Sequence, residues 1–347
     1  MLEITGERVM IIINNLVKRY GNNLAVDNIS FTVNDGEIVG FLGPNGAGKS
    51  TTMNILTGYL SATEGECLIG GVDILQRPIE AKKKIGYLPE LPPVYPEMTV
   101  REYLNFVYDL KKCTLNRKKH IDEICDVVKI ADVSHRLIGN LSKGYRQRVG
   151  FAQALIGNPE VLIFDEPTVG LDPVQIIEVR NLIKSLGKRH TVILSTHILS
   201  EVQAVCDRIV VINKGKLVAN ATANELSRIT DVTSKSRIKV TGVPDNVISA
   251  LLSINGVTEA VLEDEECQED DCRTYIITFN GSEDVRKNVS LTLARRDMAI
   301  LSFEDCTSSI EDIFISLVKG GKTVISEDDT VQPENNTDSD GTEGDEN

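Results

Sequence analysis

The residues with the clearest chemical purpose form a glycine-rich loop that ends in a lysine and a serine. From Gly43 to Ser50 the chain reads G-P-N-G-A-G-K-S, which matches a phosphate-binding loop in full. The apolar run Ile38–Leu42 is expected to be a buried strand, and Ser50–Leu60 is expected to be the helix that receives the phosphates. The alternative is a glycine-rich turn with an incidental lysine, which a strand and a helix on the correct sides disfavour. The chain is therefore predicted to bind a nucleoside triphosphate.

Each part of this loop has an expected role. Glycines allow backbone N–H groups to converge on phosphates without side-chain clashes, and the helix N-terminus adds a favourable dipole. Lys49 is expected to reach the β and γ phosphates, and the Ser50 hydroxyl is expected to ligate Mg²⁺. The residues predicted to contact the nucleotide here are Gly43, Pro44, Asn45, Gly46, Ala47, Gly48, Lys49, Ser50 and Thr51.

Two adjacent carboxylates, Asp165 and Glu166, follow the apolar run Val161–Phe164. They stand where a buried strand is expected to end, close to the phosphate-binding loop of such a fold. Asp165 is expected to hold Mg²⁺ through its water shell, and Glu166 to polarise the attacking water and accept its proton. A helix-capping or loop acid is the alternative, and alone the pair would be weak evidence. Downstream of a complete phosphate-binding loop, the pair predicts hydrolysis.

With these residues the chain resembles a known family, the ATP-binding-cassette (ABC) ATPases. The run Leu141–Arg148, L-S-K-G-Y-R-Q-R, resembles the signature sequence of that family. Gly170–Pro173 resembles the D-loop, and His197 resembles the switch histidine. Tyr20 fits the aromatic position on which adenine stacks. The resemblance spans about Val9 to Ala219.

The resemblance implies a site that two subunits share. In this family the signature of one subunit closes over the nucleotide held by another, so Ser142, Gly144 and Asp172 are expected to contact nucleotide across a homodimer or heterodimer interface. His197 is expected to contact the γ-phosphate. Read in isolation, Ser142 is a helix N-cap, which also suits phosphate binding. Three other histidines have no such support and are expected to lie at the surface, namely His120, His135 and His190.

Two departures from the commonest family pattern carry information. Glu90 occupies the position usually held by the Q-loop glutamine, where a carboxylate can still face Mg²⁺ and the attacking water. It is therefore included among the predicted catalytic and metal-binding residues. Lys143 and Tyr145 stand in the signature where Gly and Gln are commoner, and the sequence leaves open whether Lys143 reaches a phosphate or faces solvent.

The stretch Leu91–Val100 follows Glu90 and combines apolar side chains with three prolines. Prolines fix φ and stiffen a loop, which suits docking. With the two departures, this stretch is similar to the branch that includes gliding-motility and multidrug or polysaccharide-type exporters. The resemblance implies contact with the cytoplasmic helices of a membrane subunit, and the alternative is packing on a neighbouring helical subdomain.

The elements expected to position these residues are those of an α/β domain with a largely parallel sheet. Val161–Phe164 and Thr191–Ser195 are continuous apolar runs of strand length, expected to be buried on two faces. About 99–157 is predicted to be a helical subdomain. Arg208–Ile212 and Lys216–Ala219 are predicted to form a closing hairpin.

A second, small α+β domain is expected after a linker at 230–236. Its runs are ordered β-α-β-β-α-β, as in a ferredoxin-like fold over 237–320, with a final helix Ser309–Val318. This part carries no phosphate-binding loop or metal-ligand cluster. The ABC nucleotide-binding domain is expected at 1–229 and a disordered acidic tail at 321–347.

Composition limits the remaining possibilities. The chain has 347 residues, 41% of them hydrophobic, and no apolar run approaches the length of a membrane span. Met1–Arg8 lacks the features of a signal peptide, so a location inside the cell is expected. Seven scattered cysteines favour reduced thiols, and the nearest pair, Cys267 and Cys272, lacks zinc-site partners. Nine acidic residues fall in the last 21 positions, which leaves −5 of the formal charge of −14 on the rest.

These observations favour an ATP-hydrolysing subunit of an ABC exporter, which dimerises around ATP and drives separately encoded membrane permease subunits. Its expected location is cytoplasmic and peripheral, on the inner face of the cell membrane. The alternative is a soluble ABC ATPase that remodels a macromolecular assembly or acts on nucleic acid. The acidic balance and the absence of tandem cassettes disfavour that alternative, and no nucleic acid is expected as a partner. A nucleotide-gated module without turnover is disfavoured by Glu166.

Overall fold

A computed structural model describes residues 3–4, 7–222, 225, 233–263, 272–280, 285–306 and 324–325. Its central sheet has the strand order β16-β11-β10-β4-β9-β8-β7. The strands from β10 to β7 run parallel, and β11 pairs antiparallel with β10, as the hairpin prediction requires. The bounds are β4 (Ile38–Leu42), β7 (Ile85–Leu88), β8 (Val161–Asp165), β9 (Thr191–Thr196), β10 (Arg208–Asn213), β11 (Lys216–Thr222) and β16 (Val324–Ile325).

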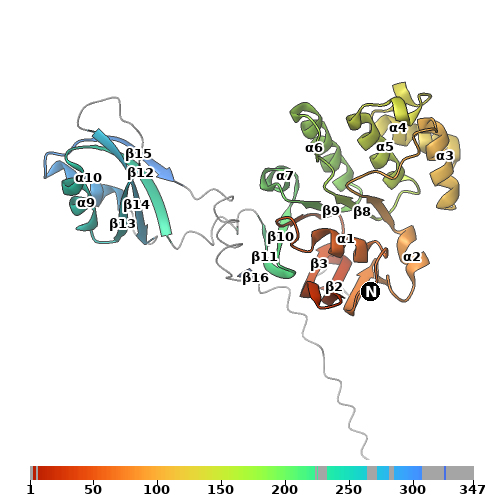
Figure 1. The fold of residues 1–347 in the computed structure, drawn as a ribbon, viewed down its shortest axis with the longest axis horizontal. Coiled ribbons are helices and arrows are strands. Elements are labelled where there is room, and N and C mark those ends of the chain that lie inside the picture. Colours follow the sequence, from red (N-terminus) through yellow and green to blue (C-terminus); the bar gives the residue numbers. More distant parts are fainter. Residues whose placement is uncertain are drawn as a thin grey trace, which may run out of the picture.

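This sheet separates two hydrophobic cores, which explains its continuous apolar strands. Every residue of β4, β8 and β9 is buried. In β8, Val161 and Ile163 face one core, whereas Leu162 and Phe164 face the other. Side chains alternate along a strand, so only a run that is apolar at every position satisfies both faces. The helices associated with this sheet in Figure 1 are α1 (Lys49–Leu56), α2 (Pro78–Lys83), α5 (Lys143–Leu155), α6 (Pro173–Gly187) and α7 (Leu199–Val205).

A second, antiparallel sheet packs against the first of these cores. Its order is β1-β2-β5-β6, with β3 paired to β2. Phe31 of β3 lies 5.6 Å from Phe41 of β4 between ring centroids, which joins the two sheets through an aromatic contact. The bounds are β1 (Glu3–Ile4), β2 (Glu7–Tyr20), β3 (Asn23–Asn34), β5 (Glu64–Ile69) and β6 (Val72–Asp73).

Most of the stretch predicted to be helical is helical. It contains α3 (Val100–Leu110), α4 (Arg117–Val127), two short 3₁₀ segments (Ala131–Val133 and Ile138–Asn140) and α5. A capping box begins α3, because Thr99 accepts from the Glu102 N–H while the Glu102 carboxylate accepts from the Thr99 N–H. The helix after the phosphate-binding loop is shorter than predicted. It ends at Leu56 rather than Leu60, and Gly58 adopts a left-handed φ of 66° just beyond it.

The C-terminal part has its own sheet and core. Four antiparallel strands follow the order β13-β14-β12-β15, and residues such as Ile238 and Tyr275 pack with the helices α9 and α10. The linker prediction was wrong in part, because Thr233–Ser236 already belong to β12. The predicted helix Ser309–Val318 lies outside the described residues. The bounds are β12 (Thr233–Thr241), α9 (Pro244–Leu252), β13 (Val257–Glu263), β14 (Cys272–Asn280), α10 (Arg286–Ala294) and β15 (Ile300–Cys306).

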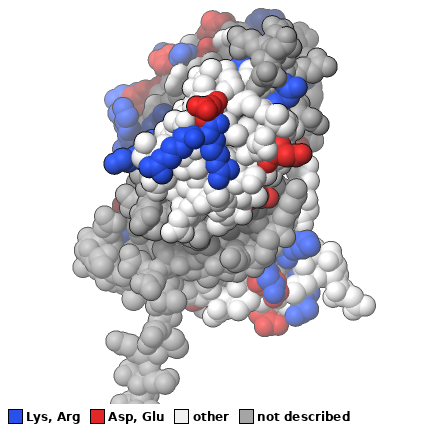
Figure 2. All heavy atoms as spheres, turned by 90° about the vertical axis from the view of Figure 1, so that its left-hand side faces the viewer, with Lys and Arg blue, Asp and Glu red and all other residues white. Residues whose placement is uncertain are grey.

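Figure 2 shows charged side chains at the centre of one face of the molecule and others toward its rim. The Lys and Arg side chains near its centre form one group with an acidic neighbour, surrounded by uncharged surface. In the C-terminal sheet, Arg237 of the inner strand β12 makes a two-point ion pair with Glu263 of the edge strand β13 at 2.6 and 2.7 Å.

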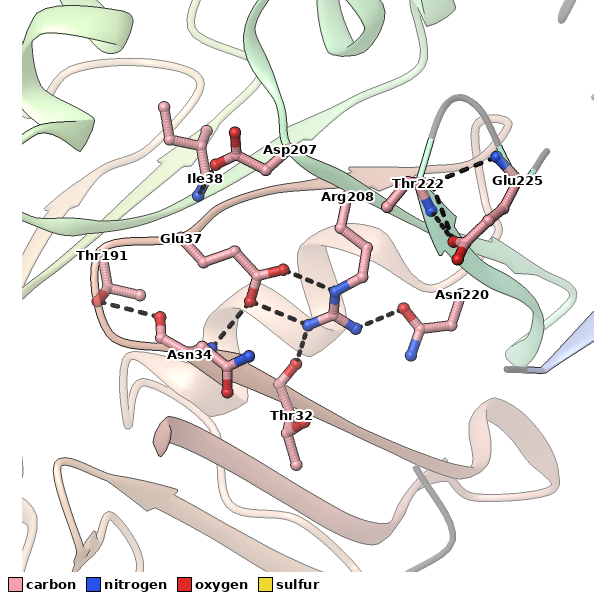
Figure 3. Close-up of polar contacts among 10 residues, drawn as sticks. All are labelled: Thr32, Asn34, Glu37, Ile38, Thr191, Asp207, Arg208, Asn220, Thr222 and Glu225. Carbon is pink, nitrogen blue, oxygen red and sulfur yellow. Dashed lines mark hydrogen bonds and ion pairs between the residues drawn. The ribbon is translucent and has the colours of Figure 1, made fainter. Parts of the chain in front are cut away.

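Arg208 joins several strands at the edge of the central sheet where β4 and β10 begin (Figure 3). Its guanidinium donates to both Glu37 carboxylate oxygens at 2.7 and 3.1 Å. It also donates to the Thr32 carbonyl and to the Asn220 side-chain oxygen, both at 2.6 Å. Glu37 in turn accepts from the Asn34 N–H at 2.9 Å. We call this set of residues the Arg208 cluster, and it links β3, β10, β11 and the start of β4.

Candidate nucleotide-binding site

The phosphate-binding loop connects β4 to α1 at the opposite edge of the sheet, where the parallel strands end. Two of its glycines are required by close backbone approach. A Cβ on Gly43 would lie 2.4 Å from the Ile212 carbonyl oxygen, and one on Gly48 would lie 2.6 Å from that of Ala25. Gly48 also has a φ of 110°, which is strained for any residue with a Cβ. The loop can therefore keep this path only with glycine at both positions.

Lys49 begins α1 and is buried, with 5% of its surface exposed. Its ammonium donates to the Gly43 carbonyl at 2.9 Å, which ties the lysine to the start of the loop. The same nitrogen lies 3.3 Å from Oε1 of Glu166. A buried cation is thus held between the loop backbone and one carboxylate of the predicted acidic pair.

Glu166 directly follows β8 and has an unusual backbone. Its φ is 48°, a left-handed value for a residue that is not glycine, and its N–H donates to the Ser195 carbonyl at 2.9 Å. The residue is 7% exposed. Nδ1 of His197 lies 3.0 and 2.9 Å from its two carboxylate oxygens, so this nitrogen carries the hydrogen when Glu166 is ionised. Lys49, Glu166 and His197 form one continuous polar chain.

Asp165 is the last residue of β8 and is 5% exposed. Burial raises the pKa of its carboxyl, and the hydroxyls of Ser195 and Ser50 partly offset this by favouring the charged form. Its Oδ1 is buried and makes no hydrogen bond. Mg²⁺ prefers oxygen ligands and needs only one or two carboxylates when phosphates supply the rest. An unsatisfied carboxylate oxygen near the Ser50 hydroxyl fits that ion.

Lys49, Glu166 and His197 line a cavity of about 790 Å³, a volume within the range of small-molecule sites, whereas Asp165 does not reach its wall. The structure brings ten of the predicted site residues to its wall. They are Tyr20, Asn45, Gly46, Gly48, Lys49, Ser50, Thr51, Glu90, Glu166 and His197.

Six further residues line the cavity and were not predicted: Asn23, Leu24, Ala25, Val169, Lys214 and Gly215. Lys214 and Gly215 were assigned only to the hairpin turn after β10. They reach the site because the Gly215 N–H donates to the Ala47 carbonyl at 2.9 Å, a contact between distant parts of the chain. Leu24 and Ala25 lie shortly after Tyr20, so that residue was the available signal for them.

Tyr20 ends β2 and is 46% exposed at the cavity wall. Nζ of Lys18 lies 5.3 Å from its ring centroid, a cation–π arrangement, and also donates to the Ser61 carbonyl at 2.6 Å. The aromatic side chain is thus held at the wall by a cation that is itself anchored.

The three residues predicted to act across a subunit interface do not line this cavity. Ser142 caps α5 by accepting from the Tyr145 N–H at 3.4 Å. Asp172 caps α6 by accepting from the Gln175 N–H at 2.9 Å. A Cβ on Gly144 would lie 2.7 Å from the Gln175 side chain, so the start of α5 packs closely on α6.

The structure shows where the Lys143 side chain points, which the sequence left open. Its ammonium reaches toward the D-loop of the same chain, because a Cβ on Gly170 would lie only 2.0 Å from Nζ. Tyr145, the other departure in the signature, donates through its hydroxyl to Asp132 at 3.2 Å. Neither side chain lines the cavity.

The surface assignment of the remaining histidines was wrong for His190. It is 7% exposed, its Nδ1 lies 2.7 Å from the Pro159 carbonyl, and burial lowers its pKa. His120 is half-buried and accepts from the Gly157 N–H at 3.0 Å, whereas His135 is exposed. Cys272 is a buried free thiol, and Cys267 lies outside the described residues. None of the described helices is long and apolar enough to span a bilayer.

Comparison with known proteins identifies the family of this chain. A family model described as ABC transporter matches residues 26–169. The chain is 40% identical over 215 residues to the bacitracin transport ATP-binding protein BcrA of Bacillus licheniformis, covering 61% of this chain and 70% of BcrA. Two relatives from Bacillus subtilis (strain 168) match at greater length. They are the uncharacterized ABC transporter ATP-binding protein YxlF, 34% identical with coverage of 89% and 99%, and the linearmycin resistance ATP-binding protein LnrL, 31% identical with coverage of 89% and 98%.

Solved structures share the fold of the nucleotide-binding part. The ADP conformation of MJ1267, an ATP-binding cassette of an ABC transporter, aligns with a TM-score of 0.57 and 28% identity, covering 65% of this chain and 94% of MJ1267. The dimeric structure of the bacterial ABC transporter cassette MJ0796 aligns with a TM-score of 0.56 and 27% identity, covering 61% and 98%. With relatives above 30% identity covered almost completely, the conclusion is that this chain is an ATP-binding protein of the ABC transporter family and has the ABC ATPase fold.

Proposed function

We propose that this chain hydrolyses ATP and that Glu166 is the general base. The observation that carries this proposal is the polar chain Lys49–Glu166–His197 at the wall of the cavity. Glu166 is buried, held by the Ser195 carbonyl through its backbone, and oriented by the His197 ring. A base fixed in this way can accept a proton from water without first reorganising. As an imidazolium, His197 would donate from Nδ1 to Glu166 and from Nε2 to the γ-phosphate.

The other residues are proposed to bind and orient the nucleotide. Lys49 and the loop N–H groups would hold the phosphates, and Tyr20 would stack on adenine. Ser50 and Asp165 would hold Mg²⁺, with Glu90 at the cavity wall close by. When bound, this ion would neutralise charge that develops on the β and γ phosphates.

We propose that two subunits complete the site. Ser142, Gly144 and Asp172 sit at helix starts outside the cavity of their own chain, where a capped N-terminus retains free N–H groups for a phosphate. A second subunit would bring these groups over the nucleotide. Closure on ATP and release after hydrolysis would form the cycle that drives a membrane partner.

Export is the proposed use of that cycle, with separately encoded permease subunits as partners and a peripheral location on the inner membrane face. The names of BcrA and LnrL refer to bacitracin transport and linearmycin resistance. The stretch after Glu90 supplies a docking surface, because Leu91 is 80% exposed and Tyr95 is 44% exposed. Tyr95 packs edge-on against Tyr103 and Phe106 at centroid distances of 6.2 and 5.7 Å. Val94 and Met98 instead pack on the helical core, as the alternative for this stretch expects.

The C-terminal unit is proposed to be a ferredoxin-like accessory domain within about 237–320. Its element order and antiparallel pairing support this proposal. The nucleotide-binding domain is proposed to occupy 1–229, with an acidic tail at 321–347, of which the structure describes only Val324 and Ile325. The tail composition supports solvation rather than a role in catalysis.

The test of hydrolysis is Glu166→Gln. This variant should bind ATP, lose turnover by about 10²–10⁴-fold and accumulate as an ATP-bound dimer, because only the proton acceptor is removed. Phosphate release and size-exclusion chromatography with ATP measure both effects. Glu160→Gln is the matched control, since Glu160 pairs with Lys84 away from the cavity. Wild-type turnover in Glu166→Gln would show that the base is another group.

Partner identity needs a separate experiment. Gentle extraction of the tagged chain, followed by identification of the co-purifying proteins, should recover a multi-span membrane protein. Leu91→Asp together with Tyr95→Asp should lose that protein while ATP binding stays intact. Recovery with ribosomes or DNA and never with a multi-span protein would favour the alternative, a soluble ATPase that remodels a macromolecular assembly.

A further inference from the structure

Glu201 is a buried carboxylate that the mechanism above does not use. It lies in α7 and is 1% exposed. One carboxylate oxygen accepts from the Thr168 hydroxyl at 2.5 Å, and the other accepts from the Thr196 hydroxyl at 2.9 Å. Both threonines are themselves buried, at 4% and 0% exposure. We call these three residues the Glu201 bridge.

The two threonines belong to the two segments that carry the proposed catalytic pair. Thr168 stands two residues after Glu166, and Thr196 stands directly before His197. The Thr196 hydroxyl also accepts from the Ile198 N–H at 3.1 Å, which fixes the turn on the other side of the histidine. The Glu201 bridge therefore spans the same two segments as the Glu166–His197 contact.

Burial of this carboxylate needs an explanation. No described residue forms an ion pair with Glu201, and its side-chain contacts are two neutral hydroxyls. A buried acid in such surroundings costs free energy that an apolar side chain of similar volume would not. Packing alone favours an apolar residue here, because the neighbouring Val202 and Leu199 belong to a hydrophobic core. In contrast, one carboxylate that accepts from both threonine hydroxyls fixes the distance between the two segments that carry them.

We propose that Glu201 is a positioning residue of the ATPase, which holds Glu166 and His197 in register by bridging Thr168 and Thr196. This inference rests on the proposed function of that pair. A displacement of about 1 Å in a catalytic group can lower a rate by about 10². Loss of the bridge should consequently lower kcat and leave the phosphate-binding loop, which it does not contact, unchanged.

The first test is Glu201→Ala, assayed for ATP turnover and for binding of a fluorescent ATP analogue. We expect kcat to fall by about 10-fold to 100-fold, with KM for ATP and analogue affinity within about twofold of wild type. Glu37→Gln is the control, because it removes the charge of a half-buried acid in the Arg208 cluster that does not line the cavity. It should lower the melting temperature and leave kcat of the folded protein unchanged.

The threonines provide variants that preserve shape, which covers the case in which Glu201→Ala does not fold. Thr168→Val and Thr196→Val each remove one hydroxyl, whereas Thr168→Ser keeps the hydroxyl and removes only the methyl group. Valine should lower kcat and serine should recover it, whereas a packing defect would not be rescued by the smaller serine. The double valine variant should cost no more than about the larger single effect, because one bridge is broken either way.

The outcomes separate this inference from the proposed function. If Glu166→Gln turns over normally, the assignment of the base fails first. If Glu166→Gln is inactive while the valine variants and Glu201→Ala keep kcat within twofold, the positioning role alone is wrong. Equal losses in kcat and in folded fraction would also overturn it, since they would show a structural role only.

Discussion

The two edges of the central sheet hold their charged side chains in different ways. At the edge where the strands begin, the Arg208 guanidinium meets Glu37, Thr32 and Asn220, each within 3.1 Å. At the edge where the strands end, Asp165 keeps a buried oxygen without a hydrogen bond, and Glu166 holds a left-handed backbone. Both edges belong to the same central sheet. At the first edge the charged groups have their hydrogen-bond partners, and we call it the stabilising edge. At the second edge, where nucleotide is proposed to bind, a charged group lacks a partner, and we call it the ligand-binding edge.

The strain at the second edge has a physical cost that the fold must offset. A left-handed residue other than glycine costs on the order of 1–3 kcal/mol, and such residues persist where their surroundings fix them. For Glu166 these surroundings are the Ser195 carbonyl, Lys49 and His197. If this comparison is correct, substitutions at the two edges should separate activity from stability.

The largest effect is expected for Lys49→Ala at the ligand-binding edge. The variant removes the cation from the loop and leaves Glu166 without its buried positive neighbour, so ATP affinity and turnover should each fall by about 10²–10³ or more. Titration with a fluorescent ATP analogue measures the first and phosphate release the second. Lys216→Ala is the matched control, because Lys216 pairs with Asp27 at 3.3 Å and does not line the cavity. Undiminished ATP affinity in Lys49→Ala would remove the basis of the nucleotide site.

The next effect is expected for Arg208→Ala at the stabilising edge. Removing the guanidinium leaves the largely buried Glu37 carboxylate without its counter-ion, so unfolding should become easier by about 2–4 kcal/mol. Urea denaturation measures this change. Arg208→Lys keeps the charge but not the planar fork and should lose about half as much stability. Folded Arg208→Ala should keep wild-type ATP affinity, and a large loss of affinity would show that the two edges are coupled.

A smaller effect is expected for pH at His190, which lies near the stabilising edge. Burial holds the pKa of this histidine below its usual 6.5, so the unfolded chain binds more protons than the folded chain in the interval between the two values. Stability should therefore be complete above pH 6.5 and decline as pH falls below it. Urea midpoints measured from pH 7.5 to 5 should show this decline.

The histidine variants identify its source. His190→Gln should flatten the decline with pH, because the titrating group is gone. The exposed His135→Gln should leave it unchanged. His120 also has a pKa lowered by burial, so His120→Gln should remove a further part of the same slope. An unchanged slope in the His190 and His120 double variant would contradict the assignment.

The sequence predicted the ligand-binding edge well because its signals are local. Ile38–Leu42, the glycine loop and Asp165–Glu166 are recognised from neighbouring residues, and the predicted strands before the loop and before Glu166 are β4 and β8. The stabilising edge escaped prediction, because Arg208 gains its partners from residues 12 to 176 positions away. His190 was misplaced for the same reason, since its ring is buried and meets the Pro159 carbonyl, 31 positions away in the chain. Lys214 and Gly215 line the cavity because Gly215 contacts Ala47, a residue distant in the sequence, and no local pattern predicts that contact.

The smallest effect should appear at Tyr20, which belongs neither to the Arg208 cluster nor to the polar chain Lys49–Glu166–His197. Tyr20→Ala removes a stacking surface at the cavity wall and should weaken ATP binding by about 10-fold, in line with about 1–3 kcal/mol for stacking of a base on an aromatic ring. Stacking depends on the π face rather than on hydrogen bonds, so GTP should weaken by a similar factor. Tyr20→Phe keeps that face and should stay near wild type in equilibrium titrations with both nucleotides.

If Tyr20→Phe lost affinity as strongly as Tyr20→Ala, the hydroxyl rather than the ring would hold the base. Because Tyr20 is 46% exposed, either variant should change stability by less than about 1 kcal/mol, which keeps this residue on the ligand-binding side of the comparison.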